Sequence, residues 1–337
     1  MVPGVLEPVE LVDFAGKRVF VTGATGFIGQ LLVRRLVHAG AIVGAGVFPG
    51  EPPERVAGLP QQARRIILDV LDATSVRRAV EDAKPDVVFH LAAIGVADPG
   101  VEPNLALAVN AGGTLHLLEA LRGRDVRRSV IPSEARNLVL LVGTCYEYGA
   151  REAVEGLDPF NAYAASKVAA WAFGRMYWRV HGLPVVTVRP FQVYGPGQPA
   201  HMLVPAAIRA ALAGEDLPMT PGMQERDFIY VDDVVEGMLA AAEAPGIEGQ
   251  SLDLGTGQAH TVRQVVGQIW AMAEARGQML PGALPYRPGE VMHLVADAAR
   301  TARLTGWRAQ VELEEGLQRT VDWAVEGFGG IYAQRAH

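Results

Sequence analysis

Tyr163 and Lys167 are the two residues of this sequence whose types and spacing best suit acid–base chemistry. They lie in the segment FNAYAASKVAAW (160–171), and a separation of four residues places them on one face of a helix. A free phenol has a pKa of about 10, and a nearby ammonium group favours its ionised form, which brings the phenol toward acid–base use near neutral pH. Lysine occurs elsewhere only at positions 17 and 84, so the pairing favours a functional role.

A hydroxyl group is expected beside this pair, at the end of a buried strand. The apolar segment RNLVLLVGT (136–144) predicts a strand that ends at Thr144, about 20 residues before Tyr163. In open α/β sheets ligands bind outside the carboxyl ends of the strands, where this threonine would lie. Thr144 can therefore place a hydroxyl group at the edge of the sheet where the Tyr163 and Lys167 pair is expected.

A glycine-rich turn near the N-terminus indicates a dinucleotide. VFVTGATGFIG (19–29) places Gly23, Gly26 and Gly29 where the first predicted strand meets the first predicted helix. Glycine permits a tight turn and close approach of a pyrophosphate, and the helix N-terminus offers unpaired N–H groups to the anion. The spacing is G-x-x-G-x-x-G and differs from the usual G-x-G-x-x-G fingerprint.

The end of the second predicted strand bears on which dinucleotide is bound. An acid about 20 residues after the glycine turn commonly binds the adenosine ribose, but this strand ends near Val47 without one. Glu51 and Glu54 follow later among prolines, and Arg55 could reach a 2′-phosphate. The pattern therefore favours NADP, with NAD held through backbone contacts as the alternative.

The elements that must position these residues alternate regularly along the chain. Strands are expected at 17–23, 41–48, 63–70, 84–93, 136–144 and 183–190, with helices at 27–40, 73–83, 110–122 and from the 160s to about 181. Apolar strands alternating with helices predict an α/β fold with a doubly wound, parallel, Rossmann-type sheet.

The second half of the chain is richer in turns and predicts a smaller substrate domain. We expect an N-terminal extension over 1–16, a dinucleotide-binding domain over 17–190, and a smaller, irregular domain over most of 191–337. The segment SLDLGTG (251–257) reads as a further strand that could return to the sheet.

Composition and charge exclude several classes of protein. The net charge is −7 and no basic run occurs, which argues against a nucleic-acid partner. The single cysteine, Cys145, excludes an internal disulfide framework and fits a cytoplasmic location. Residues 1–17 lack the apolar run of a signal peptide, and no segment is long enough to span a membrane. The histidines are scattered without metal-ligand spacing, so no metal site is predicted.

An ordered set of motifs resembles a known family. The motifs are TGATGFIG, HLAA (90–93), NAGGT (110–114), GTCYEYG, YAASK, RPFQVYGPGQ (189–198), RDFIYVDDVV (226–235) and YRPGEV (286–291). They resemble the extended short-chain dehydrogenase/reductases that act on nucleoside-diphosphate sugars, over most of residues 17–325. The resemblance implies that Thr144, Tyr163 and Lys167 are the catalytic residues, with both hydroxyls acting on one substrate oxygen and the lysine tuning the phenol. It also implies hydride chemistry at a sugar carbon, a sugar-nucleotide-binding domain over most of 191–337, and a homodimer packed through helices around 105–121 and 161–181.

The resemblance also implies binding residues. The expected cofactor-binding residues are Gly23, Thr25, Gly26, Phe27, Ile28, Gly29, Arg55, Asp69, Val70, Leu91, Ala92, Ala93, Asn110, Tyr163, Lys167 and Pro190, with Asp69 at the adenine. The expected substrate-binding residues are Thr144, Tyr146, Gln192, Arg226 and Arg287. The two arginines would clamp the diphosphate, because a guanidinium group suits phosphate oxygens.

The sequence departs from the family pattern after Thr144. The 4,6-dehydratases of this family carry acids there, whereas this chain has Cys145 and Tyr146. Glu147 comes one place later and, by strand alternation, is expected to point differently from Tyr146. Cys145 is expected to be a small buried residue, and Gln192 stands where many relatives have asparagine.

These features predict an NAD(P)-dependent enzyme acting on a nucleoside-diphosphate sugar by hydride transfer, at C4. A 4-keto-sugar reductase is the preferred reading, and a 4-epimerase with tightly held NAD is the alternative. A 4,6-dehydratase is disfavoured by the missing acids. A cofactor-binding sensor without turnover is disfavoured by the intact Thr144, Tyr163 and Lys167.

Overall fold

The fold was analysed in a computed structural model that describes residues 14–96, 100–122, 138–149, 156–287 and 289–332, with side chains up to 326 in the last helix. The extension predicted over 1–16 lies almost wholly outside the described residues, as do positions 136 and 137 of the strand predicted before Thr144. None of the helices in the described part combines the length and apolar character needed to cross a bilayer.

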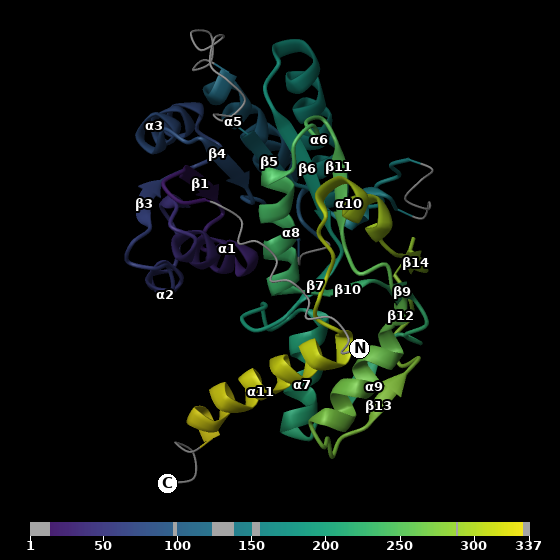
Figure 1. Ribbon diagram of the computed structural model, residues 1–337. Coiled ribbons are helices and arrows are strands. Elements are labelled where there is room, and N and C mark those ends of the chain that lie inside the picture. The colour runs from purple at the N-terminus through teal and green to yellow at the C-terminus, as the bar shows by residue number, and fades with distance from the viewer. Residues whose placement is uncertain (1–13, 97–99, 123–137, 150–155, 288, 333–337) are drawn as a thin grey trace, which may run out of the picture.

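A seven-stranded sheet forms the centre of the molecule (Figure 1). Its strand order is β11-β6-β5-β4-β1-β2-β3, and every neighbouring pair is parallel. The strands are β1 (Arg18–Thr22), β2 (Ile42–Val47), β3 (Arg64–Ile67), β4 (Val87–His90), β5 (Leu138–Val142), β6 (Val185–Pro190) and β11 (Ser251–Leu254). This arrangement confirms the predicted doubly wound parallel sheet, and the strand expected over 251–257 is β11, paired with β6.

Helices cover both faces of the sheet, as its apolar strands require. One face carries α1 (Phe27–His38) and α8 (Val231–Glu243), and the other carries α3 (Ala73–Ala83), α5 (Gly113–Arg122) and α6 (Ala162–His181) (Figure 1). Short helical segments connect them: α2 (Pro53–Ala57), α4 (Pro103–Ala106), a π-helical turn (Leu107–Gly112) and a 3₁₀ turn (Cys145–Glu147). The spacing of apolar residues in the sequence predicted α1, α3, α5 and α6, whereas α8 was not predicted.

The later part of the chain adds small sheets and helices. The strand pairs are β7 (Gln192–Tyr194) with β10 (Phe228–Tyr230), and β8 (Leu217–Met219) with β13 (Met279–Pro281); β9 (Glu225–Arg226) lies between β12 (His260–Thr261) and β14 (His293–Leu294). The helices are α7 (Leu203–Ala213), α9 (Val262–Met272), α10 (Ala298–Thr305) and α11 (Leu313–Tyr332). Helices α7, α9 and α11 share a separate apolar core, whereas α10 packs on β11.

Gly29 is required by the close packing of α1 against the glycine turn. A Cβ at this position would collide with the carbonyl oxygen of Gly23 and would lie 3.0 Å from the Cα of Ala24. We predict that Gly29→Ala lowers the free energy of unfolding by about 1–3 kcal/mol, because the added methyl group must displace the helix. Urea unfolding of the purified variant measures this change.

The matched control is Gly267→Ala inside α9. A Cβ at Gly267 would meet no other segment of the described residues within 4 Å. Alanine there should raise the free energy of unfolding by about 0.5–1 kcal/mol through its higher helix propensity. Equal unfolding midpoints for the two variants would contradict the assigned role of Gly29.

Candidate active site

The three predicted catalytic residues lie together at the carboxyl end of β5. Thr144, Tyr163 and Lys167 are all buried. Thr144 precedes the 3₁₀ turn, and the other two lie in the first turns of α6, which begins where the Asn161 side chain accepts a hydrogen bond from the backbone N–H of Ala164 at 2.8 Å. Because α6 packs on the sheet, Tyr163 and Lys167, about one helical turn apart, lie against the end of β5.

The ammonium group of Lys167 ties α6 to that strand. Its Nζ donates to the carbonyl oxygen of Val142 over 2.8 Å and lies 5.9 Å from the centre of the Tyr163 ring. Burial lowers the pKa of Lys167 to about 8, although the charge of Glu147 opposes this change. The buried lysine is therefore close to its titration point near neutral pH.

Tyr163 is a protonated phenol in the unliganded protein. Burial, and next the charge of Glu147, raise its pKa, while a hydrogen bond with Thr144 acts in the opposite direction. In the unliganded protein, desolvation is therefore a larger effect on this phenol than the effect expected from the Lys167 ammonium group.

The glycine turn forms a cradle against the loop after β4. Gly23 has a φ of +66°, and a Cβ there would lie 2.7 Å from the backbone nitrogen of Ala92. The turn is closed by a hydrogen bond of 3.1 Å from Gly26 N–H to the Gly23 carbonyl. Thr25 lies within the turn, Phe27 and Ile28 open α1, Leu91 to Ala93 follow β4, and Pro190 ends β6. A dinucleotide pyrophosphate fits such a cradle, since a side chain would fill it.

A buried polar network lies between this cradle and α6. His90 contacts the Thr22 hydroxyl through Nδ1 at 2.7 Å and the Thr114 hydroxyl through Nε2 at 2.9 Å. Burial, and next the charge of Lys167, lower the pKa of His90 to about 3, so its ring is neutral. Asn110 donates to Ser166 Oγ over 2.9 Å, which joins the π-helical turn to α6. His90 and Ser166 lie in the HLAA and YAASK motifs, but the sequence argument assigned them no role.

The adenosine end of the expected cofactor site lies in the segments that follow β2 and β3. Val47 ends β2 and is buried. Arg55 is paired with Glu51 at 3.3 Å, and the Glu51 side chain is only 13% exposed. Asp69 accepts a hydrogen bond from the backbone N–H of Leu71 at 2.9 Å, and Val70 follows it after β3.

The expected substrate residues include buried or half-buried side chains that pair with one another, and one exposed arginine. Gln192 donates to the Tyr146 hydroxyl over 2.9 Å. Arg226 is buried and paired with Glu290 at 2.6 Å, and both charges act on Tyr146. Arg287 is exposed and lies in the same turn as Glu290. Sequence reasoning missed Glu290, although the quoted motif YRPGEV contains it.

Comparison with known proteins identifies the family. Residues 19–255 match the NAD dependent epimerase/dehydratase family. The chain belongs to this family. It is 33% identical to a UDP-glucose 4-epimerase of Mycolicibacterium smegmatis, over 91% of this chain and 98% of that protein. It is 31% identical to a dTDP-glucose 4,6-dehydratase of Xanthomonas campestris pv. campestris, over 90% and 92%. The crystal structure of a Thermus thermophilus UDP-glucose 4-epimerase with NAD superposes with a TM-score of 0.78 and 29% identity, over 91% and 98%.

Positions 145 to 147 form a short turn directly after Thr144. Cys145 lies in a buried apolar cluster with Tyr148 and Phe191, and burial raises the pKa of its thiol, so it is a buried residue as expected. The expectation for Glu147 rested on strand alternation and is wrong in its premise, because these residues form a 3₁₀ turn. Glu147 instead points into the interior and pairs with Arg189.

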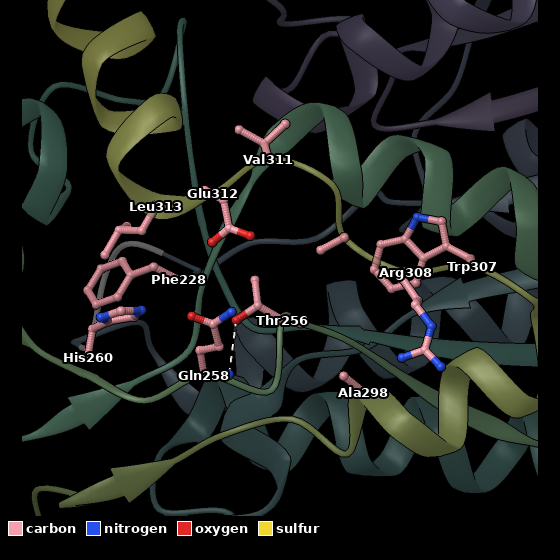
Figure 2. A pocket seen from close by; sticks show the side chains of 12 residues that line it. Phe228, Thr256, Gln258, His260, Ala298, Trp307, Arg308, Val311, Glu312 and Leu313 are labelled. Carbon is pink, nitrogen blue, oxygen red and sulfur yellow. Dashed lines mark hydrogen bonds between the residues drawn. The ribbon is translucent and has the colours of Figure 1, made fainter. Parts of the chain in front are cut away.

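A cavity of this epimerase/dehydratase-family protein lies outside the predicted site. Figure 2 shows it between the loop after β11 and the segment that leads into α11, with Thr256, Gln258 and His260 facing Glu312. The buried carboxylate of Asp227 holds the loop by accepting the backbone N–H of Thr256 at 2.9 Å. None of the predicted catalytic or binding residues lines this cavity.

Lys167 should titrate near pH 8 in the unliganded protein. Because this pKa lies below the ordinary 10.5, the unfolded chain binds more protons between these values, and the lysine makes the folded state more stable as the pH rises from 8 to 10.5. With ¹³Cε-labelled lysine, the resonance absent from Lys167→Arg identifies the group in a chain of three lysines. Titration of that resonance near 10.5 would contradict the burial argument.

Proposed function

We propose that this protein oxidises and re-reduces C4 of a nucleoside-diphosphate sugar with bound NAD, as a 4-epimerase. The observation that carries the proposal is the burial of Thr144, Tyr163 and Lys167 in one site at the end of β5. The glycine cradle at the end of β1 supplies the second requirement, a place for the cofactor pyrophosphate.

Each residue has a separate task in this proposal. Tyr163 takes the proton from the sugar hydroxyl at C4 as the hydride leaves that carbon, and returns it in the reverse step. Thr144 donates a hydrogen bond to the same oxygen, and Lys167 binds the nicotinamide ribose and supports the phenolate. The bound nicotinamide ring would accept and return the hydride and, when oxidised, add a positive charge that lowers the pKa of the phenol.

The reaction balances without an external reductant. The sugar loses a hydride and a proton to give a ketone. Both return after the keto sugar has turned over and presents the other face of its C4 carbonyl group. The epimerase reading is supported by the relatives, whose named reactions include 4-epimerisation of UDP-glucose. Cys145 and Tyr146, where the dehydratases carry acids, argue against dehydration, since neither can serve as a carboxylic acid.

The ion pair on α2 supports NAD over NADP. Glu51, in the segment between β2 and α2, places a carboxylate beside Arg55. A 2′-phosphate there would be repelled by the carboxylate, whereas a ribose diol could donate hydrogen bonds to it. The NADP preference expected from Arg55 alone is thereby weakened. We propose that the other residues expected from the sequence to bind the cofactor also contact it.

A 4-keto-sugar reductase is the second candidate. It is favoured by Val47, which leaves the end of β2 without the acid that anchors a tightly held NAD. A reductase would exchange its cofactor after every turnover and consume NADH or NADPH.

The substrate is proposed to lie between the catalytic residues and the Arg226–Glu290 pair. Arg226 and Arg287 would contact the diphosphate, while Tyr146 and Gln192 would line the sugar subsite. The relatives act on UDP- and dTDP-sugars, which supports a pyrimidine sugar nucleotide.

A homodimer is proposed through the helices on one face of the sheet. Leu105 and Leu107, in α4 and the π-helical turn, expose apolar side chains. Met176 and Val180 do the same on α6, which packs against both segments. Such neighbouring apolar side chains are typical of an interface between subunits.

Tyr163→Phe tests the acid–base role. Loss of the phenol should lower kcat by at least about 100-fold, a loss typical of a general acid–base, while NAD binding measured by calorimetry persists. Tyr177→Phe is the control, because this buried tyrosine of the same helix directs its hydroxyl to Glu119. Normal turnover by Tyr163→Phe would refute the proposed function.

Cofactor retention separates the epimerase from the reductase. We expect NAD to be released when the purified protein is denatured, and UDP-glucose to be converted to its C4 epimer with no added nucleotide. Chromatography of the released nucleotide and of the sugar products measures both. Steady oxidation of added NADPH by a 4-keto sugar nucleotide, with no epimer formed, would instead establish the reductase.

A further inference from the structure

Glu147 and Arg189 form a buried ion pair directly behind Thr144. Their side chains are 0% and 4% exposed, and Arg189 Nε donates to Glu147 Oε2 over 2.7 Å. The guanidinium group also lies 5.1 Å from the centre of the Tyr148 ring and 5.6 Å from that of Trp171. Its buried Nη2 has no hydrogen-bond partner among the described residues. Both charges are thus enclosed by protein.

Stability alone does not account for such a pair. Taking two charges out of water costs several kcal/mol for each ion, and well-packed apolar residues of similar volume are often as stable or more stable. The incomplete hydrogen bonding of Arg189 increases that cost. A role in the neighbouring site is a physical reason to keep the charges.

The second oxygen of the carboxylate holds Thr144. Glu147 Oε1 accepts the backbone N–H of Thr144 over 2.9 Å, and Thr144 Oγ1 accepts the N–H of Tyr146 over 3.3 Å. Any side chain at Gly143 would collide with the carboxylate, so the glycine makes room for it. Because Oγ1 receives a hydrogen bond from the backbone, its own hydrogen can be donated elsewhere.

We propose that Glu147 is a positioning residue: paired with Arg189, its carboxylate fixes Thr144 so that the threonine hydroxyl meets the same substrate oxygen as Tyr163. This inference rests on the proposed function, because it assigns Thr144 and Tyr163 to one step of hydride transfer. Glu147 itself contacts neither the sugar nor the cofactor.

The charge of Glu147 acts on the same two groups of α6. Burial raises the pKa of Tyr163, and Glu147 raises it further; the other groups that act on this phenol are Thr144, Cys145 and Tyr146. For Lys167, burial lowers the pKa to about 8 and Glu147 opposes that change. The carboxylate therefore keeps the phenol protonated and the lysine charged before the cofactor binds.

Three variants separate positioning from packing. Glu147→Ala removes both the hydrogen bond to Thr144 and the charge, and should lower kcat about 100-fold with little change in KM, as expected for a misplaced catalytic group. Glu147→Gln keeps an acceptor for the Thr144 N–H and should recover part of that loss. Glu147→Gln combined with Arg189→Met removes both charges and should regain thermal stability, while kcat stays at the level of Glu147→Gln alone.

Asp233→Asn is the matched control. Asp233 is a buried carboxylate that accepts the backbone N–H groups of Gln310 and Val311 at 3.0 and 2.9 Å, between α8 and the segment before α11. Its loss should lower stability and leave kcat unchanged. If kcat of the Glu147 variants equals that of the wild type, or returns with stability in the double variant, the positioning role is refuted.

A second measurement does not depend on turnover. In Glu147→Gln the pKa of Lys167, followed through its ¹³Cε resonance, should fall below about 8, whereas Asp233→Asn should leave it unchanged. An unchanged titration in Glu147→Gln would overturn the electrostatic part of the inference. A wild-type protein that converts no nucleotide sugar would refute the proposed function, whereas an active wild type with unaffected Glu147 variants refutes this inference alone.

Discussion

Parallel pairing brings the ends of β1, β4, β5 and β6 to one edge of the sheet, and the candidate site depends on that edge. The glycine cradle follows β1, the loop Leu91 to Ala93 follows β4, and Thr144 follows β5. Helix α6 then crosses the sheet and places Tyr163 and Lys167 beside the end of β5. Because helices cover both faces, the edge is the part of the sheet that remains accessible to ligands.

The second constraint on the site is desolvation. Tyr163, Lys167 and His90 are all buried within a few elements of one another, and burial disfavours their charged forms. The protein compensates by pairing: His90 lies between two threonine hydroxyls, and Lys167 donates to a strand carbonyl. A site built in this way can shift its pKa values when a charged cofactor enters, because little water screens the added charge.

Charge pairs also shape the substrate side. Arg226 is neutralised by Glu290, so a diphosphate would meet a partly compensated arginine. Tyr146 and Gln192 are joined to each other in the absence of substrate. In the proposed function, a substrate that replaced these contacts would be selected by hydrogen bonding as well as by charge. Cys145 has no role in the proposed hydride transfer, because its side chain points into an apolar cluster.

The sequence by itself determined the features that depend on neighbours in the chain. The four-residue spacing of Tyr163 and Lys167, the glycine turn with α1, and the alternation of strands and helices follow from local periodicity, and with them the fold class. The pairs that set the electrostatics join distant residues: Glu147 with Arg189, Arg226 with Glu290, and His90 with Thr22. Such contacts depend on strand order and on how each loop leaves the sheet. The direction of Glu147 is set by the 3₁₀ turn after Thr144 and not by strand alternation, and burial is the largest effect on the pKa of Tyr163. Only the tertiary structure decided these points, because desolvation and long-range pairing arise when separate segments exclude water together.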